Sequence, residues 1–300
     1  MTSALPPVTI GIPFYNAEAT LLDAVRSVFA QTHQDWELIL MDDGSTDRSL
    51  ELAHSIKDPR IKVYSDGQNK RLAARLNEMP GLATHDYLAR MDADDLMSPV
   101  RIERQLSLLV RQPELDLVST GICSLTDANE PVGVRGVAET QILHPRSVLL
   151  GSSGIVHASL LGKRDWFSRN HYREDIRTGQ DSNLWVRAFS LGDLNLAFLP
   201  DALYYYREDG NVVLPKLVAG YKECLRTILR DSGPGYSVLD KTYAFGLTLA
   251  KFLFIRVLSA TGSLDLLRNR RNRNALPQDE KDKLKQEIRS IHSVELPLAD

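Results

Sequence analysis

Strand-like and helix-like segments alternate along the first 122 residues of the chain. Short apolar runs, each typical of a buried strand, cover residues 8–13, 36–41, 61–64, 87–91 and 115–122. Between these runs, apolar side chains recur at helical spacing, as at Leu21, Val25 and Val28. A helix is also predicted over residues 72–82. Because strands that are apolar throughout need cover on both sides, the pattern predicts an α/β fold, with a mostly parallel sheet and helices on both faces.

The pattern turns helical and locally basic after about Pro215. We therefore expect one α/β domain over residues 1–215, dividing near residue 122, and a helical, partly basic extension over residues 216–300. A chain of 300 residues, 43% of them hydrophobic, is long enough for both parts. The net charge of −3 gives no overall basic field, which argues against nucleic acid as a partner.

Cysteine usage and the apolar stretches indicate a cytoplasmic protein. Cys123 and Cys224 show neither a disulfide pattern nor a zinc spacing. The first residues lack the charged region and apolar core of a secretory signal. The most apolar stretch, residues 242–258, is interrupted by Lys251 and Arg256 and is shorter than the roughly 20 apolar residues that span a bilayer. We therefore expect no membrane-spanning helix.

Acidic residues follow two of the predicted strands. Asp42 and Asp43 end the second strand, and Asp92 and Asp94 end the fourth. Ligands of parallel α/β sheets bind outside the carboxyl ends of the strands, so these residues are expected to share a cleft. Two carboxylates in Asp-x-Asp spacing can hold a hard cation such as Mg²⁺ or Mn²⁺. The alternative is that they only cap the helix that begins near Pro99; the second acidic strand end favours the cation.

The sequence contains no glycine-rich phosphate loop after its first strand. A phosphate group bound at the cleft would therefore have to be neutralised by metal and arginine. Arg71 and Arg75 are the candidates, although Arg75 is equally compatible with a solvated helix position.

Several short segments together resemble family 2 glycosyltransferases of the GT-A fold. They occur in the family's order over about two-thirds of the chain, from residue 8 to residue 210. The segments are 12–16 (IPFYN), 27–32 (SVFAQT), 41–47 (MDDGSTD), 69–77 (NKRLAARLN), 91–95 (MDADD), 179–187 (GQDSNLWVR) and 205–207 (YYR). Each segment alone is a weak signal, and seven in order are a strong one.

The resemblance implies a donor half over about residues 1–122, which binds a nucleoside-diphosphate sugar. Tyr15 would stack on the base, Glu18 would approach the ribose, and Asp43 would accept a hydrogen bond from the base, most naturally a uracil N–H. Asp42 is more simply explained as a carboxylate that holds the turn. The resemblance assigns the nucleotide sugar to Pro13, Phe14, Tyr15, Glu18, Asp43, Arg71, Asp92 and Ala93, and Mn²⁺ or Mg²⁺ to Asp94 directly, Asp92 and Asp209.

The acceptor half, over about residues 123–215, would carry the catalytic base. Asp181 is the predicted base of a single displacement that inverts the anomeric configuration. The alternative, compatible with it, is that Asp181 caps a helix. His157, Gln180 and Trp185 would contact the acceptor, although core packing explains the histidine and the tryptophan equally well.

Three positions depart from the family's usual pattern. Many members have glycine where Arg71 stands, although some have an arginine that can reach the diphosphate. The common Glu-Asp pair is Gln180-Asp181, which removes a charge beside the predicted base. An aspartate, Asp209, replaces a histidine that could bind metal.

The C-terminal extension suggests a membrane contact. One helical side of the extension has, on it or near it, the mostly apolar residues Phe245, Leu249, Phe252, Leu253, Arg256 and Val257, and a basic run follows at residues 268–273. These features suit peripheral docking on an anionic surface, at the inner face of the membrane. The alternative is a helix packed on the catalytic domain. The expected acceptor is a saccharide or lipid-linked saccharide, in surface polysaccharide or glycolipid assembly.

Two other functions are compatible with part of the pattern. A catalytically silent nucleotide-sugar-binding module is one, but it would not need both Asp94 and Asp181. A metal-dependent nucleotidyltransferase should have a glycine-rich basic loop where the chain has Pro13-Phe14-Tyr15-Asn16.

Overall fold

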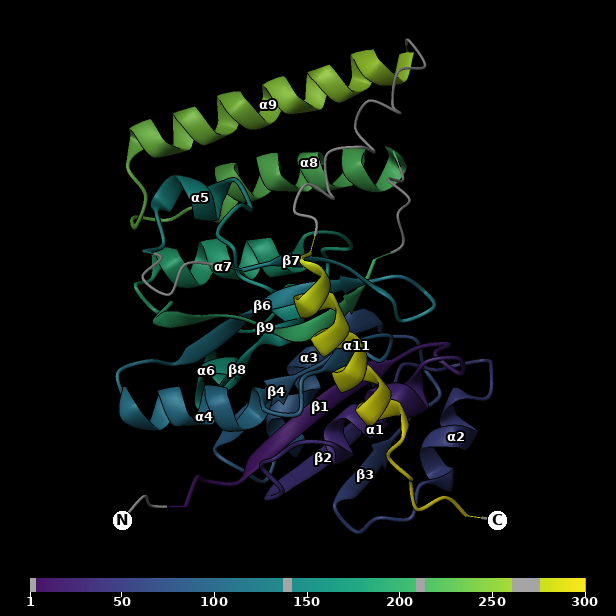
Figure 1. Cartoon of the computed structure of the whole chain (residues 1–300). Coiled ribbons are helices and arrows are strands. Elements are labelled where there is room, and N and C mark those ends of the chain that lie inside the picture. The colour runs from purple at the N-terminus through teal and green to yellow at the C-terminus, as the bar shows by residue number, and fades with distance from the viewer. Residues whose placement is uncertain (1–3, 137–141, 209–213, 261–275, 300) are drawn as a thin grey trace.

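A central nine-stranded sheet organises the computed structural model, which describes residues 4–136, 142–208, 214–260 and 276–299. Its strand order is β3-β2-β1-β4-β8-β6-β9-β5, with β7 paired to β6 beside this path (Figure 1). The mixed α/β architecture agrees with the predicted GT-A type of fold.

The first four strands in this order are parallel, as predicted. They are β1 (Val8–Phe14), β2 (Trp36–Asp42), β3 (Ile61–Tyr64) and β4 (Tyr87–Arg90). Their carboxyl ends therefore meet at one edge of the sheet. The two acidic pairs, Asp42 with Asp43 and Asp92 with Asp94, lie at this edge.

The other half of the sheet is mixed rather than parallel. It contains β5 (Leu96–Met97), β6 (Leu117–Leu125), β7 (Pro131–Arg135), β8 (Leu161–Lys163) and β9 (Leu196–Arg207). Strand β8 runs antiparallel to both β4 and β6, whereas β6 and β9 are parallel. The turn between β6 and β7 is too short for the crossover that a parallel pair needs, so these strands form a hairpin.

Helices cover both faces of the sheet, as predicted. One face packs against α1 (Leu21–Phe29), α2 (Ser49–Ser55) and α4 (Arg101–Arg111), and the other against α3 (Arg71–Leu82), α6 (Arg164–Arg169) and α7 (Gln180–Ser190). Along β1, Ile10 and Ile12 are buried in the core on the side of α1, α2 and α4, whereas Gly11 lies against Met79 of α3 on the other side. A side chain at Gly11 would meet the Met79 sulfur at 2.7 Å, so glycine permits the close approach of α3.

The C-terminal helices form outer layers on one side (Figure 1). α8 (Leu214–Arg230) packs on α7, α9 (Val238–Ala260) packs on α8, and α5 (Pro145–Leu149) contacts both α7 and α9. The predicted C-terminal helical region is thus present. The division into domains at residues 215 and 216 stays a prediction.

The last described helix leaves these layers. α11 (Gln278–His292) packs against α1 and β7, and the chain beyond it pairs Leu298 with Ile56 beside α2. The end of the chain therefore lies on the donor half.

The apolar helix is longer than the predicted stretch 242–258. Within α9, the 22 residues Val238–Ser259 are long and apolar enough to cross a bilayer by length and composition, and 22% of their most apolar 18-residue window is buried. The expectation that no helix spans a membrane stays a prediction. The two basic residues Lys251 and Arg256 do not interrupt the helix, because lysine and arginine are good helix formers.

Candidate active site

The loops after β1 and β2 are joined by hydrogen bonds. The Asn16 side-chain oxygen accepts from the Thr46 backbone N–H at 2.8 Å, and the Asn16 N–H donates to the Ser45 hydroxyl at 3.1 Å. Asp43 N–H also donates to the Phe14 carbonyl at 2.8 Å. These bonds bring the two predicted nucleotide-binding loops together.

Asp42 and Asp43 play different roles in this edge of the sheet. The buried Asp42 carboxylate accepts from the Ser45 N–H at 2.9 Å and the Ser65 hydroxyl at 2.7 Å, so it holds the turn as expected. Asp43 Oδ1 accepts from the Lys70 N–H at 2.8 Å, and Oδ2 from the Arg71 N–H at 3.0 Å. Asp43 thereby fixes the start of α3, and its bond to a nucleobase stays a prediction.

The two candidate arginines differ in what they can bind. Arg75 is neither a solvated helix residue nor a free phosphate ligand. It is buried and paired with Asp43 at 2.9 Å, Asp66 at 2.6 Å and Glu78 at 2.9 Å. Burial opposes its charge, but these carboxylates raise the pKa of Arg75. Arg71 is exposed at the same edge, so its guanidinium can reach a ligand.

The other predicted donor-binding residues surround the carboxyl end of β1. Pro13 and Phe14 are buried in the strand, whereas the Tyr15 side chain is 50% exposed and offers a ring face. Glu18 is exposed, and its carboxylate accepts from the Arg48 N–H at 3.1 Å. The structure thus leaves Tyr15 accessible for stacking on a base.

Three carboxylates gather directly after β4. Oxygens of Asp92, Asp94 and Asp95 all lie within 4.8 Å of one another, with the buried Ala93 between the first two. Asp95 is already used: it accepts from the Tyr204 hydroxyl at 2.8 Å and from the Arg207 N–H at 2.8 Å. Asp94 is exposed and Asp92 half-buried, so these two carboxylates are accessible to a ligand. Capping of the next helix does not explain the cluster, because α4 begins only at Arg101.

The negative charge of this cluster is only partly balanced by its surroundings. Partial loss of hydration and the charge of Asp92 raise the pKa of Asp94. Burial, together with Asp92 and Asp94, raises the pKa of Asp95 well above its usual range. A bound divalent cation would relieve this repulsion, which is the chemistry expected of an oxygen donor set.

Arg90 is a site residue that the sequence analysis missed. It ends β4, is 5% exposed, and its Nη2 contacts Asp92 Oδ1 at 2.6 Å. Among the described residues, its Nε and Nη1 have no hydrogen-bond partner. Burial disfavours the charge, but Asp92 and Asp181 contribute to raising the pKa of Arg90, so both carboxylates act on one cation. The available signal was a single arginine inside the apolar run 87–91.

Asp181 lies in the first turn of α7. Gly179, with φ of 79°, occupies the N-cap position and no side chain caps the helix, so the alternative that Asp181 is the cap is wrong. The negative charge of Asp181 acts on Arg90 and on Tyr172, whose pKa is raised chiefly by burial. Asp92 and Asp181 therefore both act on Arg90 and Tyr172, and the role of Asp181 as the base stays a prediction.

The predicted acceptor residues lie around Asp181. His157 Nε2 is 2.6 Å from the Tyr172 hydroxyl, and burial with the charge of Arg90 lowers the pKa of His157 well below its usual value. Trp185 is 3% exposed and stacks on Trp166 with ring centroids 6.0 Å apart. Core packing therefore explains Trp185 and leaves little of its surface for an acceptor. Acceptor contacts of His157 and the half-buried Gln180 stay predictions.

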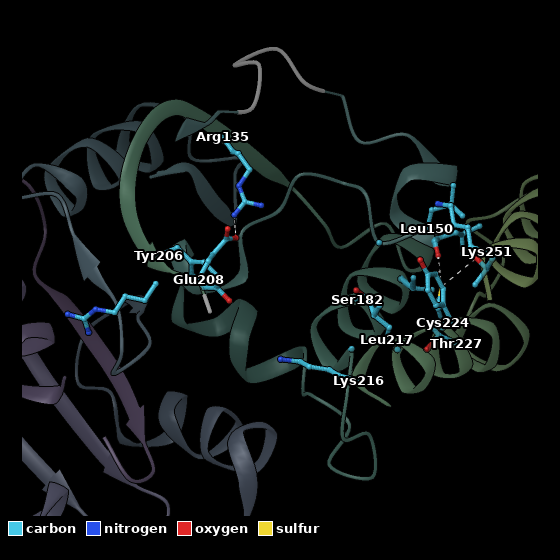
Figure 2. A pocket seen from close by; sticks show the side chains of 18 of the residues that line it. Arg135, Leu150, Ser182, Tyr206, Glu208, Lys216, Leu217, Cys224, Thr227 and Lys251 are labelled. Atoms are coloured by element: carbon cyan, nitrogen blue, oxygen red, sulfur yellow. Dashed lines mark hydrogen bonds and ion pairs between the residues drawn. The ribbon is translucent and has the colours of Figure 1, made fainter. Parts of the chain in front are cut away.

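A cavity of about 940 Å³ leads away from the acidic cluster. It begins at Asp94 and Tyr206, passes Ser182 on α7 and reaches Cys224 on α8 and Lys251 on α9 (Figure 2). Among the predicted site residues that the structure describes, Asp94 alone lines it. Asp209, the third predicted metal ligand, lies outside the described residues.

The arrangement supplies an anionic centre that can hold a cation, an exposed aromatic ring and an exposed arginine. Such a set of groups is suited to binding an anionic ligand together with a cation.

Comparison with known proteins gives a consistent result. The profile described as Glycosyl transferase family 2 matches residues 9–167. The putative glycosyltransferase EpsE of Bacillus subtilis (strain 168) is 34% identical over 212 residues, which cover 69% of this chain and 74% of EpsE.

Two solved structures share the fold at low sequence identity. S. aureus TarS 1–349 in complex with UDP-GlcNAc has a TM-score of 0.58 and 15% identity, over 95% of this chain and 81% of that one. This chain covers 43% of the longer TarS structure. The mannosyltransferase PcManGT from Pyrobaculum calidifontis, in complex with GDP-Man and Mn²⁺, has a TM-score of 0.57 and 16% identity, over 97% and 87% of the chains.

Proposed function

The chain belongs to glycosyl transferase family 2, and on that premise we propose that it moves a sugar from a nucleoside diphosphate, preferably uridine diphosphate, to an acceptor hydroxyl with inversion. The observation that carries the proposal is the acidic cluster after β4, where oxygens of Asp92, Asp94 and Asp95 lie within 4.8 Å of one another and Arg90 pairs with Asp92 at 2.6 Å. The sugar nucleotides in the TarS and PcManGT complexes support the donor class.

The residues of the cluster fit Mn²⁺ or Mg²⁺. Asp94 and Asp92 would hold the cation, because the oxygens of Asp95 already accept from Tyr204 and Arg207. When bound, such a cation supplies positive charge beside the departing diphosphate.

The protein's own residues would divide the remaining work. Tyr15 stacks on the base, and Arg71 meets the diphosphate through its exposed guanidinium. The acceptor oxygen bonds to the anomeric carbon as the bond from that carbon to the diphosphate breaks. The acceptor proton moves to the Asp181 carboxylate. The new bond forms on the face opposite the leaving group, and the configuration inverts.

The acceptor in this proposal is a saccharide or lipid-linked saccharide used in surface polysaccharide or glycolipid assembly at the cytoplasmic face of a membrane. Two features of α9 support it. Leu249, Leu253 and Phe254 are exposed on the helix, beside the exposed Lys251 and Arg256. Phe245 packs inward instead, and the basic run 268–273 lies outside the described residues. The cavity from Asp94 ends at Lys251, so an acceptor held at α9 has a path to the cluster.

Calorimetric titration of UDP, GDP, CDP and dTDP, each with and without Mn²⁺, tests the proposal. We expect one diphosphate, UDP first, to bind with Mn²⁺ and to lose that metal dependence in Asp94→Ala. The control is Asp127→Ala, which removes an exposed carboxylate of the same cavity. Binding that is identical in Asp94→Ala would remove Asp94 from the site. Donor binding without transfer or hydrolysis would identify a silent binding module.

A further inference from the structure

The C-terminal helix α11 lies behind the acidic cluster. Its buried Ile288 and Ile291 form a separate small core with Leu96, Cys123, Leu125 and Tyr205. Leu96 is the residue next to Asp95, and the Tyr205 hydroxyl bonds to Glu287 of α11. The segment after α11 is also bound to the donor half, because the Lys57 N–H donates to the Pro297 carbonyl at 2.6 Å. A helix nearly 200 residues away in sequence therefore backs the segment that carries Asp92 and Asp94.

A continuous set of hydrogen bonds joins this helix to Asp94. Arg207 Nη1 donates to the Asp94 carbonyl at 2.7 Å, and its Nη2 and Nε donate to the Asn129 side-chain oxygen at 2.7 and 2.9 Å. Asn129 Nδ2 lies 3.1 Å from His292 Nε2, at the end of α11. His292 Nδ1 in turn lies 3.3 Å from Asp23 on α1.

The donors and acceptors in this set determine one another. Arginine only donates, so the oxygen of Asn129 must face Arg207 and the amide nitrogen must face His292. His292 Nε2 must then accept, which places its proton on Nδ1, opposite the Asp23 carboxylate. Asp23 Oδ2 also lies 3.7 Å from Arg207 Nη2 and closes the ring. The bond from Asn129 to His292 helps to hold the Asn129 amide in the orientation that Arg207 needs. We therefore expect loss of the histidine acceptor to weaken the bonds between Asn129 and Arg207.

Arg207 uses most of its donors within the protein. Each of its side-chain nitrogens is directed at Asp94, Asn129 or Asp23, and its side chain is 10% exposed. Its contact with the cluster is through the backbone of Asp94, not through the carboxylate. Arg207 is thus suited to fixing where the Asp94 carboxylate points.

We propose that α11, acting through His292, Asn129 and Arg207, positions the Asp94 loop for cation binding. This proposal rests on the proposed function in one respect, which is the choice of Mn²⁺ or Mg²⁺ as the cation. Groups that orient metal ligands usually contribute 10–100-fold to metal affinity. We expect His292→Phe, which keeps the ring and removes both nitrogens, to weaken Mn²⁺ binding by about 10-fold.

Two measurements separate this proposal from the function. Hydrogen–deuterium exchange of the full-length chain should show faster exchange over residues 92–97 in His292→Phe and in Ile291→Ala, with β1 and β2 unchanged. Gln286→Ala, an exposed change on the same helix, should exchange as the wild type does. Titration of Mn²⁺ alone, followed by electron paramagnetic resonance, then compares the metal affinities.

A double-mutant cycle of Arg207→Lys and His292→Phe decides whether the two residues act together. We expect the losses of protection at residues 92–97 to be non-additive, because both changes break the same set of bonds. Unchanged exchange at residues 92–97 in His292→Phe would overturn the proposal, whatever the enzyme transfers. Altered exchange in a protein that binds no Mn²⁺ would support the coupling and count against the proposed function instead.

Discussion

Arg71 holds a backbone conformation that usually requires glycine. Its φ is 73°, and its N–H donates to Asp43 at 3.0 Å, which keeps the strained residue in place. A left-handed conformation costs a non-glycine residue roughly 1–2 kcal/mol. The strain gives a physical reason why many family members have glycine at this position, and why an arginine kept there should have a function.

We predict opposite effects of Arg71→Gly on stability and on donor binding. The relief of strain offsets the added freedom of glycine in the unfolded chain, so the free energy of unfolding in urea should stay within about 1 kcal/mol of wild type. Affinity for the diphosphate should fall about 10-fold or more, because one charge-assisted hydrogen bond is lost. Arg71→Lys is the matched control that keeps the charge. Equal affinity in wild type and Arg71→Gly would show that Arg71 does not reach the donor.

Asp181 is far in sequence from the other predicted carboxylates of the site, and its charge acts on Arg90. We predict that Asp181→Asn keeps donor affinity and loses transfer by on the order of 10²-fold or more, because the amide cannot take the acceptor proton. Steady-state transfer rates and donor calorimetry check the two parts. Asp201→Asn, which changes an exposed acid paired with Arg104, should transfer normally. Full activity of Asp181→Asn would place the base elsewhere.

At the scale of elements, α9 has two different sides that single residues do not reveal. Its inner side, with Ala244 and Ile255, is buried, while Leu253 and Phe254 are 54% and 57% exposed. Basic side chains beside an exposed apolar surface are typical of helices that lie in a membrane interface. Packing and membrane contact, which the sequence offered as alternatives, are therefore compatible on different sides of one helix.

We predict that the full-length protein sediments with anionic vesicles and that the double change Leu253→Gln and Phe254→Gln reduces the bound fraction. The loss should be 10-fold or more in partition coefficient, because a buried leucine or phenylalanine side chain contributes about 1.5–3 kcal/mol. Leu191→Gln, which changes a still more exposed leucine just after α7, is the control. Vesicle binding that is the same in all three proteins would exclude this side of α9, and resistance to carbonate extraction would indicate a spanning helix instead.

At the scale of the whole molecule, Glu37 joins the amino ends of the parallel strands. Its carboxylate accepts from Thr9 on β1 and from the Thr84 N–H before β4, both at 2.6 Å, and pairs with Lys62 on β3 at 2.7 Å. Burial opposes the charge, but these partners lower the pKa of Glu37 to about 2. The group therefore stabilises the fold above the pKa of unfolded glutamate, and this stabilisation is lost as the pH falls from about 4.5 toward 2.

We predict that Glu37→Gln lowers the free energy of unfolding by on the order of 2–3 kcal/mol at pH 7. The difference from wild type should shrink at pH 3.5, because wild-type Glu37 then loses part of its advantage. Urea unfolding at pH 7, 5 and 3.5 measures both effects, with the exposed Glu295→Gln as control. A difference that does not depend on pH would show that the charge of Glu37 is not what stabilises the sheet.

The local elements could be predicted closely from the sequence. The strand over residues 61–64 was predicted with its observed bounds, and the helix predicted over 72–82 begins one residue earlier, at Arg71. Apolar periodicity works for such segments because each reports only which of its own sides is buried. The same argument placed Asp43 and Asp94 at strand ends on one edge, because parallel strands end together.

The errors have one cause, which is that contacts between distant segments leave no local pattern. The sequence predicts that Arg75 could lie on the helix surface, but the residue is buried and paired with Asp66 and Asp43. The sequence predicts that Trp185 could contact the acceptor sugar, but its ring stacks on Trp166 in the core. The antiparallel strand β8 was missed because three residues are too few for a periodic signal.

The sequence by itself determined the order of strands and helices, the acidic strand ends and the family, since all of these depend on residues close together in the chain. The tertiary structure alone decided that Arg90 is buried with a single carboxylate partner, Asp92, at 2.6 Å among the described residues, and that His292 bonds to Asn129 across 163 residues. Such pairings depend on how the helices stack on a sheet that is closed by non-local strands. Their free energy comes from burial and hydrogen bonding, which form only when the whole chain is folded.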